Sequence, residues 1–184
     1  GHPIVQDGWR LFGSPNVNVR VKNALDAVLD PAQYEAFTCA GPDGKPLFKD
    51  GQPHWRWQKE LPPIDSKAEA EWVKKGLLKP EQTRYLPGGV ILHSGSVRWN
   101  EHRKKWLLLA GQIGGTSLLG EVWYSESDLP TGPFAKAVKV ITHDKQTFYN
   151  VCHHDFLDRG SAIYLEGTYT SDFSGNPVKT PRYD

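Results

Sequence analysis

The stretches LHSGSVRWNEHRKKWLLLAG (residues 92–111) and LLGEVWYSESDLPTGPFAKAVKVI (residues 118–141) decide the fold of this chain. Polar and apolar residues alternate over 92–99 and again over 118–125, as in strands with one buried face. Residues 106–110 are continuously apolar, as in a strand buried on both faces, and 134–141 form a last run. Turn residues separate these runs. The pattern predicts four antiparallel strands in a meander.

A four-stranded meander of about fifty residues has the size of one blade of a β-propeller. A second segment has the same order of features. Residues 30–34, like residues 128–134, contain an acidic-proline turn and then an aromatic residue before a final strand. We therefore interpret 8–39 as the last three strands of a first blade whose innermost strand is missing. Residues 91–141 are interpreted as a complete blade and 148–184 as a partial one.

Residues 40–90 do not follow this repeat and are interpreted as an insertion between blades. Turns rich in Gly and Pro flank a short hairpin, with 54–58 as its return strand. Ser66 and Glu69 have the spacing of a capping box, which predicts a helix that ends at Gly76. The predicted fold is all-β, an incomplete β-propeller over residues 1–184 with about two to three blades and one inserted helix.

The composition excludes several classes of protein. Charged residues make up 23% of the chain and the net charge is +1, so no basic surface for nucleic acid is expected. The longest apolar runs are about five residues, too short for a membrane span, and no signal peptide is visible. The sequence contains no methionine, and we expect a mature, trimmed or internal segment. Cys39 and Cys152 are predicted to lie too far apart for a disulfide and to be free thiols.

The run GEVWYSESDLPTGPF (residues 120–134) resembles the blade motif of five-bladed β-propeller carbohydrate-active proteins, the arabinanase- and xylosidase-like glycoside hydrolases and their relatives. Segments 93–110, 148–170 and 176–183 also resemble uncharacterised secreted propeller proteins of environmental bacteria, planctomycetes among them. The resemblance implies a five-bladed propeller, a carbohydrate as the partner and an extracellular or periplasmic location.

In those hydrolases, carboxylates from separate blades meet at one mouth of the central axis and serve as general acid and base. The sequence Leu165-Glu166-Gly167 resembles the Glu-Gly-Pro that holds the acid in those families, with Thr168 in the place of the proline. The aspartate that the family carries near the start of its first blade has no counterpart in this sequence.

Glu166 and Asp155 are the candidate catalytic residues. Superposing the repeats places Glu166 where the complete blade has Leu109, so an ionisable group takes an apolar position. A functional acid would explain this position. A strand-end glutamate that pairs with an arginine or faces solvent would explain it equally. Asp155 follows two histidines at the end of the predicted innermost strand 148–156.

His93, His153 and His154 lie on predicted innermost strands and are candidates for substrate binding. Near the axis, imidazoles and the Asp155 carboxylate suit a sugar hydroxyl, or a calcium or other ion in a central channel. The alternative is that they are hydrogen-bonded core histidines. The sequence has no metal-binding spacing such as HExxH, and no other cofactor is expected.

Trp55 and Trp57 fall on one face of an extended strand and are candidates for stacking on sugar rings. They serve equally well as a cap on the hydrophobic rim of a propeller. The core between blades is predicted to contain three other tryptophans, Trp99, Trp106 and Trp123. Glu121 and Glu126 are predicted to be solvated strand residues.

Other chemistries lack their motifs, since there is no phosphate-binding Gly-rich loop, no GxSxG and no CxxC. We expect a carbohydrate-active propeller that hydrolyses or binds a glycoside or polysaccharide through axial carboxylates and aromatic residues. The alternative is a non-catalytic propeller that acts as a binding or structural module in a larger assembly. In either case another polypeptide, or the rest of the same chain, would complete the ring.

Overall fold

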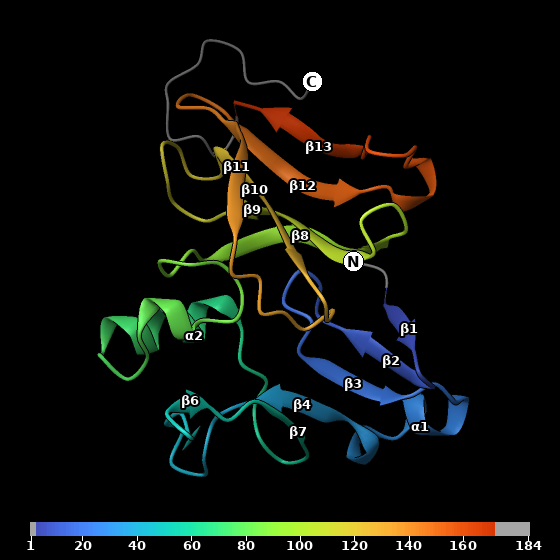
Figure 1. Ribbon diagram of the computed structural model, residues 1–184, viewed down its shortest axis with the longest axis vertical. Coiled ribbons are helices and arrows are strands. Elements are labelled where there is room, and N and C mark those ends of the chain that lie inside the picture. The colour runs from blue at the N-terminus through green and yellow to red at the C-terminus, as the bar shows by residue number, and fades with distance from the viewer. Residues whose placement is uncertain (1–2, 172–184) are drawn as a thin grey trace.

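The computed structural model describes residues 3–171, which form mostly antiparallel β-structure. Figure 1 shows the sheets following one another along the longest axis of the molecule, with the N-terminal sheet at the bottom and the β12–β13 pair at the top. The all-β class expected from the sequence is confirmed. The part of the last predicted blade beyond residue 171 lies outside the described residues.

The first sheet has five strands in the order β1 (Ile4–Gln6), β2 (Trp9–Phe12), β3 (Val19–Lys22), β4 (Glu35–Thr38) and β7 (Arg56–Gln58). The prediction that its innermost strand is missing is wrong, because β1 pairs antiparallel with β2. The strand is only three residues long, and its alternation is too short to read from sequence. It is nevertheless anchored, since Ile4 is buried in the same hydrophobic cluster as Leu11.

Residues 17–28 contain a long series of apolar residues, but only Val19–Lys22 form a strand. β3 ends at Lys22, and a short helix α1 (Leu25–Leu29) and a 3-10 helix (Pro31–Gln33) follow. Leu25 and Leu29 are 75% and 72% exposed, so the apolar residues of this run do not continue a buried face. The Asp30 side chain accepts a hydrogen bond from the backbone N–H of Ala32 and so caps the 3-10 turn.

The insertion contributes both a hairpin and a strand of the first sheet. β5 (Phe48–Lys49) and β6 (Gln52–Pro53) form the hairpin, closed by Asp50 and Gly51 with positive φ at both positions. Two such residues form a tight turn that completes a hairpin without further strands. The sequence suggested that residues 54–58 are the return strand of this hairpin, and this prediction is wrong. Instead β7 extends the first sheet, where Phe37 pairs with Trp57.

The predicted helix is α2 (Ser66–Lys74), whose cap is shifted by one residue. The Asp65 carboxylate, rather than the Ser66 hydroxyl, accepts from the N–H of Ala68 at 2.8 Å. Ser66 Oγ instead accepts from the N–H of Leu92 at 2.9 Å and ties the helix to the start of the second sheet. The helix ends before Gly76, which has φ +69°, as predicted. A 3-10 helix (Pro80–Gln82) leads on towards the second sheet.

The second sheet is the predicted four-stranded meander, in the order β11 (Ala137–Thr142), β10 (Glu121–Ser127), β9 (Lys105–Gln112) and β8 (Leu92–Asn100). Its continuously apolar strand is buried on both faces. Leu108 belongs to the core shared with the first sheet, whereas Leu109 belongs to a cluster with Val151 of the following strand pair. The run is apolar throughout because alternate residues fill two different cores.

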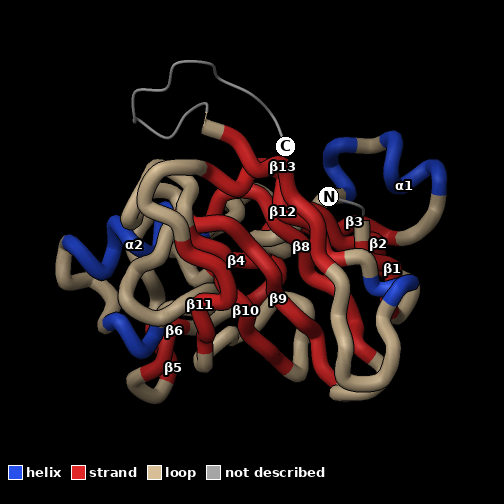
Figure 2. Tube along the Cα trace, turned by 90° about the horizontal axis from the view of Figure 1, so that it is seen from above, coloured by secondary structure: helices blue, strands red, loops and turns tan. Residues whose placement is uncertain are grey.

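The last described sheet pairs β12 (Thr147–His153) with β13 (Leu165–Thr170). β12 lies beside β8 and runs in the same direction, since Tyr149 contacts His93 and the N–H of His153 donates to Ser96 Oγ at 2.8 Å. The predicted strand 148–156 is too long, because a 3-10 helix (Asp155–Leu157) follows His153. Figure 2 shows the helices at the periphery of the strands.

The two cysteines behave as the sequence suggested. Cys39 is buried, Cys152 is half-buried, and both are free thiols. Within residues 3–171 no helix has the length and apolar character that a membrane span requires.

Candidate functional site

The end of β8 and the turn after it, together with the 3-10 helix and turn that follow β12, surround a cavity of about 230 Å³. Three carboxylates line it, Glu101, Asp155 and Asp158, together with the amide of Asn100 and the imidazole of His102. Two aromatic side chains, Trp99 and Phe156, form apolar parts of its wall. Polar groups that converge beside apolar surface are typical of small-ligand sites.

Asp158 is the most firmly held of these carboxylates. His153 Nε2 lies 2.9 Å from one of its oxygens and 3.1 Å from the other, and Asn100 Nδ2 donates to it at 2.7 Å. His153 and Asn100 are 1% and 2% exposed, so buried side chains fix the orientation of the carboxylate. Because a carboxylate only accepts, His153 Nε2 is the donor to Asp158, and His153 Nδ1 has no hydrogen-bond partner among the described residues.

The local sequence explains how these groups meet. Asn100 ends β8, and its side-chain oxygen accepts from the N–H of Arg103 at 2.8 Å, which closes the turn into β9. His153 ends β12, and the 3-10 helix that follows reverses the chain. The N–H of Asp158 then donates to the carbonyl of Asp155 at 3.1 Å. This short return brings the Asp158 carboxylate back to the ring of His153.

The two predicted catalytic carboxylates lie in different surroundings. Asp155 is not on an innermost strand but in the 3-10 helix, where its carboxylate lies 3.7 Å from Arg98 Nε and is 47% exposed. Glu166 is 70% exposed and lies 3.0 Å from His154 Nε2. Superposing the repeats placed Glu166 at the apolar position of Leu109. The two positions differ in burial, because Leu109 is fully buried and Glu166 faces solvent. Asp155 lines the cavity and Glu166 does not.

The predicted histidines are divided among three environments. His153 is buried and holds Asp158, whereas His154 is partly exposed and its ring lies edge-on to Phe156 at 5.4 Å. His93 lies further along β8, with its ring 5.5 Å from Tyr149 and its Nδ1 3.2 Å from Ser94 Oγ. Asp155 therefore lines the cavity, His153 lies behind it as the buried partner of Asp158, and His93 belongs to neither group.

The predicted sugar-stacking residues Trp55 and Trp57 belong to the packing between the insertion and the first sheet. Both rings contact Phe37, at 5.7 Å and 4.8 Å between centroids. The guanidinium groups of Arg84 and Arg20 lie 4.6 Å and 4.5 Å from the Trp55 and Trp57 rings, respectively. Each tryptophan packs against a hydrophobic cluster, and neither lines the cavity at Asp158.

Of the residues that line the cavity, only Asp155 was predicted from the sequence, and Trp99, Asn100 and Asp158 are among those that were missed. Asn100 and Asp158 stand at turn positions, where Asn and Asp are common for reasons of backbone geometry. Trp99 was assigned to the core, and this is wrong, because it is 39% exposed and its Nε1 donates to Glu101 at 2.8 Å.

A second polar cluster, also missed, lies in the core beneath α2. Glu69 and Arg84 are each 2% exposed, and Arg84 Nε lies 3.8 Å from the Glu69 carboxylate. The backbone N–H groups of Arg84 and Tyr85 donate to the other carboxylate oxygen, at 2.8 Å and 3.3 Å. Burial raises the pKa of Glu69 to about 7, although Arg84 and the two N–H donors offset part of this rise.

The raised pKa of Glu69 predicts a pH-dependent stability. The folded state keeps the Glu69 proton to higher pH than the unfolded chain does. The contribution of Glu69 to the free energy of unfolding is therefore greatest below about pH 4.5 and falls as the pH rises towards 7. We expect the difference in unfolding free energy between the protein and its Glu69→Gln variant to decrease over this window, by up to about 1.4 kcal/mol per pH unit. Urea titrations at a series of pH values measure it, and a constant difference would contradict the assignment.

A comparison with known protein families, curated proteins and solved structures finds no match for this chain. Over residues 3–171 no group of three or more His, Cys, Asp or Glu side chains is arranged to hold a metal ion. The chemistry available at the first cavity is that of one oriented carboxylate, two further carboxylates, an amide and an imidazole beside exposed aromatic surface.

Proposed function

We propose that the protein is a carbohydrate-active β-propeller that hydrolyses a glycoside or polysaccharide at the cavity around Asp158. The observation that carries the proposal is the Asp158 carboxylate, held by buried His153 and Asn100 beside the exposed rings of Trp99 and Phe156. Sugar rings present apolar C–H faces and polar hydroxyl edges, and this cavity offers aromatic and hydrogen-bonding groups side by side.

Cleavage of a glycosidic bond uses two carboxyl groups that flank it. Asp158 is the fixed member of such a pair, because two buried donors, His153 Nε2 and Asn100 Nδ2, set its direction. Asp155 is the second member on the same cavity, and its partner Arg98 lies 3.7 Å away. Glu166 with His154 stays a candidate at the neighbouring strand pair, as the family resemblance implies.

The propeller itself is part of the proposal. The two meander sheets and the β12–β13 pair follow one another along the chain, and β8 and β12 lie side by side in the same direction, as innermost strands of adjacent blades would. We propose further that additional blades, from another polypeptide or from the rest of the same chain, close the ring and that the protein acts outside the cytoplasm.

The test is a hydrolysis screen on glycosides and polysaccharides, followed by the Asp158→Asn variant. Loss of the oriented carboxylate is expected to lower the turnover by at least about 100-fold, as for loss of an acid–base group. Asp128→Asn is the matched control, because Asp128 is 81% exposed and lies outside the cavity. Unchanged turnover in Asp158→Asn would refute the site. Unchanged turnover in Glu166→Gln would remove Glu166 from it.

A non-catalytic glycan-binding or structural module is the second candidate. It is favoured by one observation, that the carboxylates near the cavity already have partners, Asp155 with Arg98 and Glu166 with His154. In this case glycan arrays are expected to show binding that Asp158→Asn abolishes, while the unaltered protein releases no product from any glycan that it binds.

A further inference from the structure

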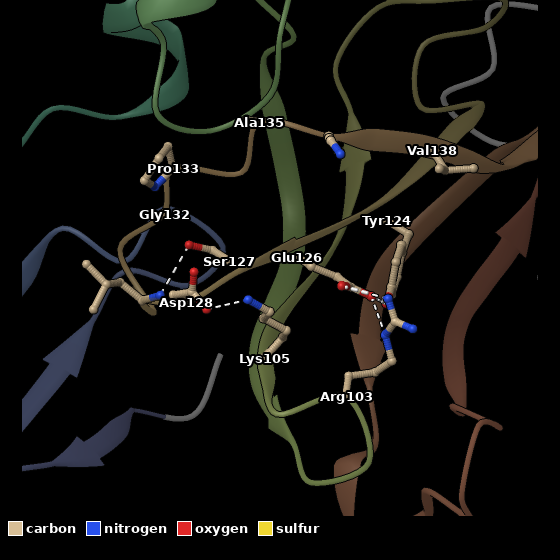
Figure 3. A pocket seen from close by; sticks show the side chains of 12 residues that line it. Arg103, Lys105, Tyr124, Glu126, Ser127, Asp128, Gly132, Pro133, Ala135 and Val138 are labelled. Carbon is tan, nitrogen blue, oxygen red and sulfur yellow. Dashed lines mark hydrogen bonds and ion pairs between the residues drawn. The ribbon is translucent and has the colours of Figure 1, made fainter. Parts of the chain in front are cut away.

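A second cavity, of about 620 Å³, lies on the outer part of the second sheet and shares no lining residue with the cavity at Asp158. Figure 3 shows it between β9, β10 and the segment that leads from β10 into β11. Its volume is within the usual range for sites that take small organic molecules. The proposed hydrolytic chemistry makes no use of it.

The wall of this cavity is largely apolar. Tyr124, Leu129, Pro133, Ala135 and Val138 contribute to it. Leu129 and Val138 are 54% and 58% exposed, so the free protein leaves these side chains in contact with water. Exposed apolar surface in a concave site is stabilised when a ligand covers it.

Most of the charges around the cavity are already neutralised within the protein. Arg103 forms two hydrogen bonds with Glu126, at 2.7 Å and 3.0 Å, and Lys105 pairs with Asp128 (Figure 3). The hydrogen bonds from Arg103 hold the pKa of Glu126 below its usual value, so this pair keeps both charges at neutral pH. Neither pair has net charge to offer to a ligand.

Lys136 is the exception. It lines the cavity, and within residues 3–171 it forms no ion pair. Its backbone is held against the sheet, because the Ser125 hydroxyl donates to the Lys136 carbonyl. The lining as a whole therefore has one unmatched positive charge, from Arg103, Lys105 and Lys136 against Glu126 and Asp128.

We propose that this cavity binds a small organic anion with a flat apolar body, of the class of aromatic carboxylates. The apolar body lies against Tyr124, Leu129 and Val138, and its carboxylate pairs with the ammonium group of Lys136. A neutral molecule of the same shape gains the apolar contacts alone, and a cation meets the unmatched lysine. The site thus selects by charge at one end and by shape over the rest.

The experiment compares 2-naphthoate with 2-naphthamide, which has the same ring system without the charge. Titrations followed by ¹H–¹⁵N NMR are expected to show both compounds shifting the amide signals of Tyr124 and Val138, with 2-naphthoate bound roughly three- to fivefold more tightly. Lys136→Gln is expected to abolish this preference and leave the binding of 2-naphthamide unchanged. Lys145→Gln is the matched control, since Lys145 is exposed and outside the cavity.

Several results would overturn the proposal. These are equal affinity for the two compounds, a preference that survives Lys136→Gln, shifts that map to another part of the protein, and no binding of either compound. None of them bears on hydrolysis at Asp158, because the two cavities have no lining residue in common.

Discussion

At a pH above about 7, where Glu69 is ionised in the folded protein, replacing Arg84 with methionine is expected to lower the free energy of unfolding by about 3–5 kcal/mol, the cost of leaving a buried carboxylate without its counter-ion. The uncompensated group is Glu69, which is 2% exposed. Methionine fills a similar volume, so the loss measures the polar contacts rather than a cavity. Burying a carboxylate without a charge partner also favours its protonated form, which raises the pKa of Glu69 further.

Arg84 holds three parts of the chain together. Its guanidinium donates to the carbonyl of Val17, next to the first sheet, and to that of Ile64 in the insertion, at 3.3 Å and 3.1 Å. Its own carbonyl accepts from the N–H of Phe134, in the second sheet's connection, at 2.7 Å. The guanidinium also lies 4.2 Å to 4.8 Å from the rings of Tyr85, Trp55 and Phe37.

Chemical denaturation of the purified variants measures this effect. Lys75→Met is the matched control, because the Lys75–Glu71 pair is 64% and 55% exposed, and its loss is expected to change the stability by less than about 0.5 kcal/mol. The double variant Glu69→Gln/Arg84→Met is expected to lose less than the sum of the two single changes. A loss in Arg84→Met as small as in Lys75→Met would show that the buried pair contributes nothing to stability.

Replacing Gly95 with alanine is the second change with a large expected effect. A Cβ at this position would lie 2.4 Å from the Leu109 carbonyl oxygen, and 2.6 Å and 2.7 Å from Cβ and Cα of Ala110. These atoms belong to the paired strand β9, so relief requires β8 and β9 to separate locally. We expect a loss of about 3 kcal/mol or more, as in overpacked cores.

Gly111→Ala is the control for Gly95→Ala. Gly111 lies on β9 of the same sheet, and a Cβ there would meet its nearest neighbouring atom at 3.8 Å. Its substitution is expected to cost less than about 1 kcal/mol. Thermal unfolding of both variants gives the comparison, and equal midpoints would refute the steric account of Gly95.

The second sheet could be predicted because its pattern is long and unambiguous. The run at 106–110 is apolar throughout, and the flanking strands alternate, so strand type and order follow from periodicity alone. The strands of the first sheet were harder to predict. β1 has three residues, and the apolar positions of 17–28 continue past Lys22 into a helix whose leucines are exposed.

The candidate site was only partly predictable, since it depends on how turns fold back. His153 and Asp155 were found by residue type, but Asp155 lies in a 3-10 helix and not on a strand. Asn100 and Asp158 stand at turn positions, where these residue types are common, and the structure shows that they are also partners of one another. Glu69 was interpreted as part of a capping box, and nothing in its local sequence indicates the buried Arg84 opposite it.

The two-sided burial of β9 has a consequence for how the protein unfolds. Leu108 and Leu109 are adjacent in the chain, yet each belongs to a different hydrophobic core. Opening either core disturbs the one strand that both share, and the strand's backbone is hydrogen-bonded on both edges. We therefore expect the two cores to be thermodynamically linked, so that the first sheet and the β12–β13 pair, which pack on opposite faces of the second sheet, unfold with it as one cooperative unit.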